Sequence, residues 1–324
     1  MGKILLDHGK GGAATQELLT DLFLKHLSSP VLHCLEDSAL LEEHAGRLAF
    51  STDCYINEPL FFPGGNVGSL AVFATINNLA MRGAMPLALS LGLIIEEGFS
   101  LRDLEKIIQS IGISSTIAEV AIVTGDTKVV PQGRIEGVCL NTSGIGLVSD
   151  GVDVSGANIA AQDCIIISGN IAEHGLALHC CSKPSAFYPS TVRPLHFMIQ
   201  EIINSFPGAL HALRDPTRGG LATSLVWLAS ASGVCLEIDE TAIPISSASR
   251  KLCLQENLDP LYLNSQGRCI LCCDSESAMD IVALMRKTET GRDAKIIGHA
   301  SSSPMGRVRF YSKEGQSRFV EALD

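Results

Sequence analysis

The sequence predicts two α+β domains of similar size, and three observations support this fold class. With 324 residues, the chain exceeds the ~250–300 residues at which a single hydrophobic core stops growing. Strand-like and helix-like runs alternate in each half of the chain. A polar, glycine-containing stretch at 149–163 separates the two alternations. We therefore expect domains at 1–150 and 151–324, with mixed sheets rather than doubly wound parallel ones.

Capping residues and apolar periodicity predict the elements of the first half. Asn66 and Ser100 are residue types that cap helices, and each precedes a run with helical apolar spacing. The run 118–123 predicts a strand that ends at Thr124, and a turn is expected from Gly125 onward. The other predicted elements are helices at 13–27, 67–83 and 100–119 and strands at 47–52, 85–98 and 137–148.

The second half is predicted to follow the same alternation. A strand is expected at 164–169, then a helix near 192–205 and another helix after the glycines at 219–220. Further strands are expected near 234–238, 268–273, 294–300 and 307–312.

Charge and hydropathy exclude two classes of partner. Lys and Arg number 24 against 35 Asp and Glu, which gives a net charge of −11 and a surface that repels nucleic acid. The longest apolar run, 87–95, is far shorter than the ~20 residues that cross a bilayer, and no signal peptide is evident. We expect a cytoplasmic protein that binds neither nucleic acid nor membranes.

The eleven cysteines are typical of buried thiols in a reducing compartment. Cys269 and Cys272 have a metal-type spacing, but they lie in a strand-like run that points them to opposite faces. His174, His179 and Cys180 form a second candidate cluster, in which a helix would not place the two histidines on one face. Structural roles are favoured for both clusters, with metal or redox chemistry as the alternative.

Acidic residues and glycines at turns predict a site for a phosphorylated ligand. Asp37, Asp53, Asp126 and Asp215 each stand at an expected turn or strand end, and Mg²⁺ takes carboxylates together with phosphate oxygens. Lys128, two residues after Asp126, can hold a phosphate or deliver a proton. Glycine turns at 8–12, 63–66 and 218–220 let backbone N–H groups approach an anion, although none matches a Walker A or Rossmann loop.

A series of motifs extends over residues 8–298, nearly the whole chain. In order they read HGKGG, EDSA, LAFSTDCYINEPLFFPGGNVGSLAV, LIIEEGF, VTGDTKVV, NTSGIG, HG at 174–175, DPTRGG, LDPLY and IIG. This series resembles the HypE family of hydrogenase maturation factors, within the PurM-like aminoimidazole ribonucleotide synthetase superfamily. PLFFPGGNVG followed by GDTKVV is typical of HypE rather than of the purine or selenophosphate members.

The resemblance implies a two-domain, sandwich-like α+β architecture. It implies a homodimer whose N-terminal domains form a shared β-barrel at the interface, with ATP and Mg²⁺ bound nearby. HypE-like proteins use ATP to phosphorylate a carbamoyl group, whose dehydration leaves a nitrile on a C-terminal cysteine. The expected partners are a second copy of the chain and a maturation protein similar to HypF, HypC or HypD.

The resemblance also assigns site residues by motif. Asp37, Asp53 and Asp126 would hold the metal, and Lys128 and His174 would take part in catalysis. The implied cofactor-binding set comprises Lys10, Gly11, Gly12, Asp37, Asp53, Gly64, Gly65, Asn78, Asp126, Thr127, Asp215, Arg218 and Gly219.

Three departures from the family pattern fall on the specialised steps. Asn78 stands where the family has an aspartate, and one charge pair at ~4 Å is worth roughly 4 kcal/mol before desolvation. Gln266 stands at a catalytic glutamate position and cannot accept a proton near neutral pH. The tail reads SRFVEALD instead of ending in Pro-Arg-Ile-Cys, and the last cysteine is Cys273.

Two hypotheses of different class follow from matches and departures together. The first is an ATP-dependent carbamoyl dehydratase-type enzyme that acts on a free or partner-borne carboxamide. The second is a catalytically impaired paralogue that serves as a nucleotide-binding scaffold or regulator. Phosphoryl transfer to a small metabolite is a third, more generic possibility.

Overall fold

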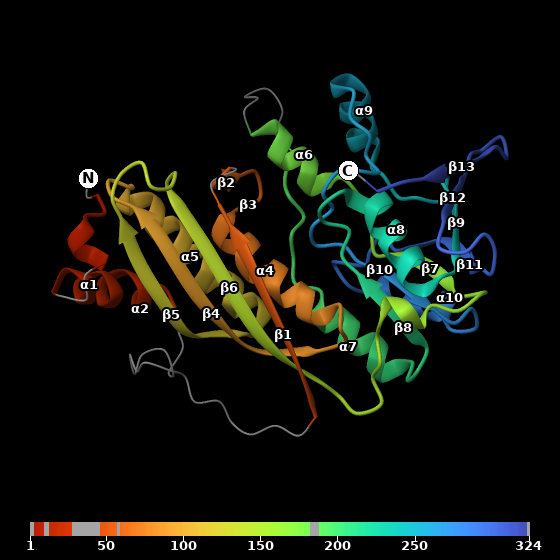
Figure 1. Cartoon of the computed structure of the whole chain (residues 1–324), viewed down its shortest axis with the longest axis horizontal. Coiled ribbons are helices and arrows are strands. Elements are labelled where there is room, and N and C mark those ends of the chain that lie inside the picture. The colour runs from red at the N-terminus through yellow and green to blue at the C-terminus, as the bar shows by residue number, and fades with distance from the viewer. Residues whose placement is uncertain (1–2, 10–12, 28–45, 57–58, 182–187, 323–324) are drawn as a thin grey trace.

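The computed structural model describes residues 3–9, 13–27, 46–56, 59–181 and 188–322. Two sheets with their own helices lie side by side, one built from each half of the chain (Figure 1). The first sheet ends at Val148 and the second begins at Cys164. This arrangement confirms the predicted two-domain fold with mixed helix and sheet content.

The first sheet has four strands in the order β1-β6-β4-β5. Its strands are β1 (Arg47–Tyr55), β4 (Met85–Glu96), β5 (Ala121–Val130) and β6 (Val138–Val148). Only β4 and β5 pair in parallel; β6 is antiparallel to both β1 and β4. A small hairpin, β2 (Phe61–Phe62) and β3 (Gly65–Asn66), precedes the first long helix.

Two long helices cover one face of this sheet, and both begin where the sequence predicts. They are α4 (Val67–Ala80) and α5 (Leu101–Ala118). The Asn66 side chain accepts the N–H groups of Gly68 and Ser69, and Ser100 accepts that of Asp103. Near the N-terminus a 3-10 helix (Leu6–Gly9) precedes α1 (Ala13–Leu18), a π-helical turn (Leu19–Phe23) and α2 (Leu24–His26). The last three are continuous and together form the helix predicted at 13–27.

The predicted turn at Gly125 is wrong, because β5 continues through Val130. Parallel pairing with β4 extends to the end of this segment, and Ile94 faces Lys128 across the pair. The Asp126 and Lys128 side chains are exposed, so an edge strand accommodates these polar residues without burying their charge. Likewise β1 runs two residues past Asp53, which therefore lies within a strand rather than at its end.

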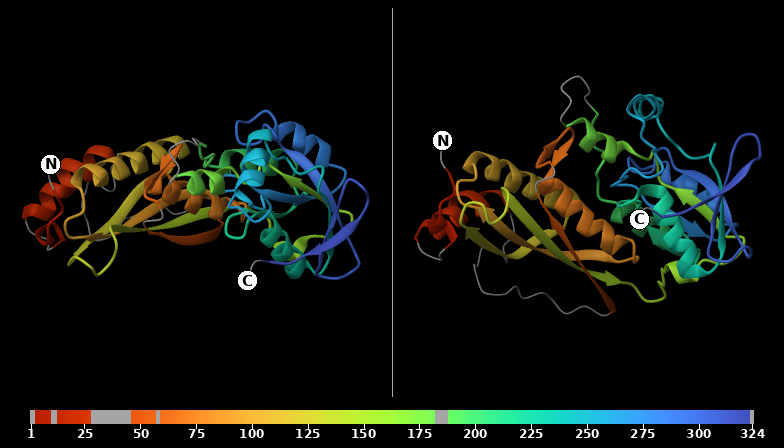
Figure 2. Two further views of the ribbon diagram at one scale, coloured as in Figure 1. Left: turned by 90° about the horizontal axis from the view of Figure 1, so that it is seen from above. Right: turned by 45° about the horizontal axis from the view of Figure 1, so that its top comes forward.

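The face of the first sheet opposite α4 and α5 is uncovered by any described helix (Figure 2). We call it the open face. It carries large apolar side chains with high exposure: Leu48 65%, Phe50 71%, Ile94 40% and Met85 37%. The described strands form an open sheet and not a closed barrel, so the shared β-barrel stays a prediction about an assembly.

The second sheet has seven strands in the order β13-β12-β9-β11-β7-β10-β8. They are β7 (Cys164–Ile167), β8 (Leu210–Arg214), β9 (Cys235–Asp239), β10 (Ile270–Cys273), β11 (Lys295–Ser301), β12 (Val308–Tyr311) and β13 (Ser317–Val320). The β9–β12 pair is parallel and the other pairs are antiparallel, which confirms a mixed sheet.

Helices cover both faces of the centre of this sheet. They are α6 (Glu173–Cys180), α7 (His196–Ser205), α8 (Gly220–Ser232), α9 (Ser247–Glu256) and α10 (Ala278–Met285). Ile165 and Ile167 of β7 pack in one core with α8, and Ile166 packs in another with α7 and α10. Sequence reasoning missed α6, β8, β13, α9 and α10, each of which has ten residues or fewer. No described helix is long and apolar enough to cross a membrane.

The two halves are joined by a buried amide as well as by the chain. Helix α7 of the second half packs against α4 and β4 of the first. The Asn77 side chain of α4 is fully buried. It donates to the Arg193 carbonyl at 3.0 Å and accepts the Leu195 N–H at 2.8 Å. Because both of its polar groups are satisfied, this amide fixes α4 against the segment that enters α7.

The ten described cysteines are all free thiols. Cys269, Cys272 and Cys273 are fully buried in or beside β10, and burial raises the pKa of each. This confirms the core-strand interpretation of that cluster. Among the described residues, no group of three or more His, Cys, Asp or Glu side chains is arranged to hold a metal ion.

Candidate functional site

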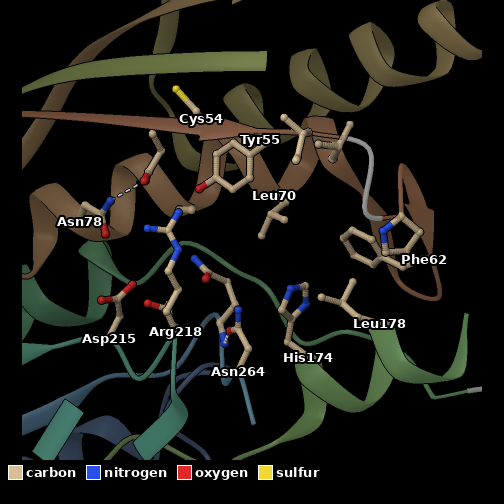
Figure 3. Close-up of a pocket in the computed structure, with 17 residues that line it drawn as sticks. Cys54, Tyr55, Phe62, Leu70, Asn78, His174, Leu178, Asp215, Arg218 and Asn264 are labelled. Carbon is tan, nitrogen blue, oxygen red and sulfur yellow. Dashed lines mark hydrogen bonds between the residues drawn. The ribbon is translucent and has the colours of Figure 1, made fainter. Parts of the chain in front are cut away.

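A cavity of about 450 Å³ lies between the two halves of the molecule (Figure 3). Strand β1, the β2–β3 hairpin and α4 line it from the first half. Helix α6 and the loops before α8 and β10 line it from the second. One end is polar, with Asp53, Asn78, Asp215, Arg218, Asn264 and Gln266; the other is apolar, with Phe62, Leu70 and Leu178.

Asp53 anchors the polar end from β1. Side chains alternate along this strand, so Asp53 and Tyr55 turn toward α4 and away from the open face. The Asn78 Nδ2 donates to Asp53 Oδ2 at 2.5 Å (Figure 3). Burial raises the pKa of Asp53, while the Tyr55 hydroxyl, the Arg218 charge and the Asn78 amide act against that rise.

Asp215 and Arg218 come from the loop that enters α8. Burial raises the pKa of Asp215 to about 6, partly offset by the Arg214 charge and by a backbone hydrogen bond. The Arg218 guanidinium extends into the cavity between Asp215 and Tyr55 (Figure 3). It is exposed and forms no hydrogen bond with any described residue. A cation with free N–H donors is therefore presented to the cavity.

His174 reaches the cavity from the first turn of α6. It is 1% exposed, and its Nδ1 lies 2.8 Å from the Ser190 Oγ. The Phe62 ring meets it edge-on, with ring centroids 5.4 Å apart. Burial lowers the pKa of His174 to about 4, so the imidazole is neutral at physiological pH. A neutral imidazole can accept or relay a proton.

Gln266 is held on a loop tied to the start of α6. The Ser265 Oγ accepts the Ala172 N–H at 2.8 Å, and Arg268 forms a 3.0 Å ion pair with Glu173. The Gln266 N–H donates to Asn264 Oδ1 at 2.9 Å. Gln266 as a whole residue is 5% exposed, it lines the cavity, and its side-chain amide has no hydrogen-bond partner among the described residues. Such a group is a candidate for contact with a ligand.

The structure does not bring the residues of GDTK to this cavity. Asp126, Thr127 and Lys128 lie on β5, at the opposite edge of the sheet from β1. Asp126 faces Gly92 in the parallel pair, and among the described residues the Asp126 Oδ1 accepts the N–H of Thr127 alone. Within one chain, Asp53 and Asp126 therefore lie apart. Asp37, Lys10, Gly11 and Gly12 lie outside the described residues.

The predicted glycine turns have structural reasons that the sequence did not reveal. Gly64 has φ +89°, and a Cβ there would lie 2.8 Å from the Ser190 backbone. A Cβ on Gly65 would lie 2.8 Å from Ser69 Oγ, and one on Gly219 would lie 2.3 Å from Thr223 Oγ1. Gly64 thus lets the hairpin pack against the Ser190 segment, Gly65 lets it pack against α4, and Gly219 is the N-cap of α8.

The second candidate metal cluster is not assembled. His174 points into the cavity, whereas His179 lies 3.1 Å from Glu256 of α9. Sequence reasoning also missed three residues that shape the site: Tyr55, Asn264 and Ser190. Tyr55 could have been found, because residues two apart in a strand share a face with Asp53. No local signal marks Ser190, which depends on long-range packing.

The described residues do not make a Mg²⁺ site of the kind predicted. Mg²⁺ takes hard oxygen ligands in near-octahedral geometry. Of the two predicted metal ligands among the described residues, Asp53 lines the cavity and Asp126 does not; a second carboxylate, Asp215, also lines it, and one Asp53 oxygen accepts the Asn78 amide. The positive charge beside it is Arg218. Unpaired donors at Arg218 and Gln266 instead suit phosphate or carbonyl oxygens.

Comparison with known proteins follows the same two-part division. The AIR synthase related protein N-terminal domain profile matches residues 35–148, and the C-terminal domain profile matches residues 160–310. Carbamoyl dehydratase HypE of Cupriavidus necator is 39% identical over 327 residues, covering 99% of this chain and 93% of that protein. The Escherichia coli carbamoyl dehydratase HypE is 35% identical, with coverage of 92% and 90%.

Solved structures give the same match in three dimensions. The hydrogenase maturation protein HypE in complex with ATP superposes with a TM-score of 0.95 at 39% identity, covering 99% of this chain and 98% of that one. HypE in a HypE–HypF complex superposes with a TM-score of 0.83 at 37% identity, covering 96% of this chain and all of that one.

Proposed function

The chain belongs to the HypE family of AIR synthase related proteins, and from that premise we propose that it is an ATP-dependent carbamoyl dehydratase. The observation that carries the proposal is the polar end of the interdomain cavity. It combines an arginine without a hydrogen-bond partner among the described residues, Arg218, an unpaired amide that lines the cavity, Gln266, and a neutral imidazole, His174. Relatives over the full length are named carbamoyl dehydratases, and one solved relative is an ATP complex.

The proposed reaction has two steps that balance. ATP transfers its γ-phosphoryl group to the oxygen of a primary carboxamide or carbamoyl group, which gives ADP and an O-phosphoryl imidate after loss of one N–H proton. Loss of the second N–H proton and breakage of the C–O bond then give a nitrile and inorganic phosphate. Phosphorylation turns the amide oxygen into a competent leaving group, and positioning with charge stabilisation accounts for most catalysis in such transfers.

The cavity residues divide these tasks. Arg218 is placed to stabilise phosphoryl oxygens, because its donors are free and it faces the cavity. Gln266 is placed to fix the carboxamide through its unpaired amide, which offers one donor edge and one acceptor edge. His174 is the proton acceptor in this proposal, because its pKa of about 4 keeps it neutral and Gln266 cannot fill that role.

The proposal includes a homodimer that closes over the open face. Exposed apolar side chains such as Leu48 and Phe50 on a sheet face are typical of an interface, and a closed sheet has no free edge. Asp126 and Lys128 lie on the same face as Ile94. A second copy on the open face would therefore bring them into the interface, where the family resemblance places ATP.

ATP in solution carries Mg²⁺, and we assign that ion to the nucleotide rather than to the Asp53 carboxylate. A maturation protein similar to HypF is the proposed partner, since one solved relative is a HypE–HypF complex. All described cysteines of β10 are buried, so none of them is an accessible acceptor. Cys54 is an exposed thiol in the lining of the cavity, but its side chain alternates away from Asp53 toward the open face. We therefore propose that the carboxamide is carried by a separate molecule or a partner.

Turnover of the purified full-length chain tests the proposal. ADP and phosphate release are measured with Mg²⁺–ATP, with and without carbamoyl phosphate, a thiocarbamate and simple primary carboxamides, while mass spectrometry follows the loss of water. The expected result is donor-dependent ADP release that His174→Gln lowers by ~10²–10⁴-fold. His179→Gln, on the same helix but outside the cavity, is the matched control. ATP binding without turnover on any donor would favour the scaffold hypothesis instead.

A further inference from the structure

We propose that Asn78 and Arg218 together replace a divalent cation at Asp53, so that the polar end of the cavity binds polyphosphate through a protein cation and without a metal ion on that carboxylate. The site of interest is the contact between β1 and α4, seen in Figure 3. It rests on the proposed function only for the identity of the ligand as a nucleotide phosphate.

The first observation is the direction of the Asn78 side chain. Its Nδ2, a donor, points at Asp53 Oδ2 at 2.5 Å. The N–H occupies one lone-pair site of the Asp53 carboxylate, and in this orientation Asn78 presents a donor where a metal ion would need a second oxygen ligand. An aspartate at position 78, as the family pattern expects, would instead place two carboxylates face to face, which a divalent cation would neutralise.

The second observation is the local charge. Arg218 acts on Asp53, Asp215 and Tyr55, so its guanidinium provides the positive charge of this end. Its N–H groups make no hydrogen bond with described residues and it lines the cavity. A divalent ion beside it would meet a like charge in a partly desolvated space. A phosphate oxygen would meet unpaired donors instead.

The two observations fit one another. With an amide at 78, two carboxylates, Asp53 and Asp215, carry the negative charge of this end; Arg218 acts on both and Arg214 acts on Asp215. An aspartate at 78 would add a third carboxylate beside the same two arginines, which calls for a further cation. The presence of asparagine instead of aspartate at position 78 therefore accounts both for the N–H that points at Asp53 and for the use of Arg218 as the cation.

Metal binding by the nucleotide-free, full-length protein gives the first test. Mn²⁺ is titrated by electron paramagnetic resonance into the wild type, Asn78→Asp and Asn264→Asp. Asn264 lines the same cavity but does not bond Asp53, so it is the matched control for an added carboxylate. Asn78→Asp is expected to gain one Mn²⁺ per chain, bound at least about tenfold more tightly than by the wild type or the control.

Two outcomes would overturn the proposal. One is a wild type that already binds Mn²⁺ as tightly as Asn78→Asp and loses the ion on Asp53→Asn. The other is an Asn78→Asp protein that shows the native thermal transition and gains no Mn²⁺. Neither readout needs ATP turnover, so failure of the proposed function leaves this test intact.

Anion binding without metal gives the second test. Inorganic tripolyphosphate is titrated calorimetrically into the wild type in EDTA, with Arg218→Gln and, as control, Arg250→Gln on α9. We expect binding in EDTA that Arg218→Gln weakens at least about tenfold and Arg250→Gln leaves unchanged. Tripolyphosphate that binds only when Mg²⁺ is added would contradict the inference.

Discussion

The two edge strands of the first sheet carry the two aspartates expected to share a ligand, and they hold them in opposite ways. On β1, Asp53 faces α4, accepts the Asn78 amide and has a raised pKa because it is partly buried. On β5, Asp126 is exposed, and within the part of the chain that the structure describes its carboxylate accepts only the adjacent Thr127 N–H. Asp53 is integrated into a cavity, whereas Asp126 stands on a surface.

Asp53 and Asp126 lie at opposite edges of the sheet and also point to opposite faces of it. A row of paired residues crosses the sheet from Asp126 through Gly92 and Asn141 to Cys54, three strand spacings or roughly 14 Å. Cys54 and Asp53 are neighbours in the strand, so their side chains point to opposite faces. A single chain therefore holds half of the predicted nucleotide site at each edge. Uniting the two kinds of half-site requires a second copy whose β5 edge reaches the Asp53 side of the sheet at β1.

The largest expected effect comes from breaking that union. Phe50→Glu adds a charge to the centre of the open face, where the native side chain is 71% exposed in one chain. We expect a dimer of the wild type to become a monomer, because burying an unpaired charge in an interface is strongly unfavourable, and we expect turnover to fall at least ~100-fold. Sedimentation velocity and the ADP-release assay measure both.

The control for this change is Phe319→Glu, on the second sheet. Phe319 is 45% exposed and stacks against Arg307 and Arg309, away from the open face. It should leave the oligomeric state and turnover unchanged. A Phe50→Glu protein that remains a dimer with normal turnover would show that the open face is not the interface.

A smaller but more specific effect is expected from mixing two inactive variants. Asp53→Asn and Asp126→Asn each remove one half of the site, so each homodimer should be inactive. If each site takes Asp53 from one chain and Asp126 from its partner, half of the mixed dimers are heterodimers with one intact site. Co-expression should then restore about a quarter of wild-type turnover. No recovery in isolated, tagged heterodimers would place both aspartates in one chain's site.

Sequence reasoning located the elements of the first half well and the geometry of the site only in part. Asn66 and Ser100 are local signals, and both caps form as predicted. The polar segment at Asp126 was misread as a turn because an exposed edge strand lacks the apolar alternation that marks a half-buried one.

The site itself depends on contacts that no local pattern encodes. Gln266 and His174 lie far apart in sequence, and loops tied by Ser265 and Arg268 bring them to one cavity. The resemblance of the motifs to the family identified both residues. The direction of a hydrogen bond, such as the one from Asn78 to Asp53, could be assigned only from the coordinates, because an amide can present either its N–H or its carbonyl end.

A moderate effect on the free energy of unfolding is expected from substituting Asp215, and none from substituting the exposed Asp126. Burial raises the pKa of Asp215 from 3.8 to about 6. Between these values the unfolded chain loses the proton while the folded chain keeps it, so this residue's contribution to stability is full below pH 3.8 and is lost as the pH rises through 6. Asp215→Asn should therefore raise the free energy of unfolding at pH 8 by ~1–3 kcal/mol.

The pH dependence of that gain provides its own check. Urea denaturation of Asp215→Asn and the wild type should give a difference that shrinks toward zero near pH 3, because Asp215 is then largely protonated in both states. Asp126→Asn, the matched exposed aspartate, should show no difference at either pH. A gain at pH 8 that persists unchanged at pH 3 would assign the effect to packing rather than to charge.

The smallest expected effect on folding stability comes from substituting Lys128. The substitution also tests whether β5 contributes to ligand binding. Lys128 is exposed and forms no ion pair within 4.0 Å among the described residues. Lys128→Ala should change the free energy of unfolding by less than ~0.5 kcal/mol, since exposed substitutions away from special features are nearly neutral. The affinity of Lys128→Ala for ATP should nevertheless fall, as measured by calorimetry at a fixed protomer concentration.

Lys106→Ala, which removes an exposed lysine paired with Asp103 at 2.8 Å, should leave ATP affinity unchanged. A Lys128→Ala protein with wild-type ATP affinity would confine nucleotide binding to the β1 edge of the sheet. The β5 edge would then be an ordinary solvent-exposed surface.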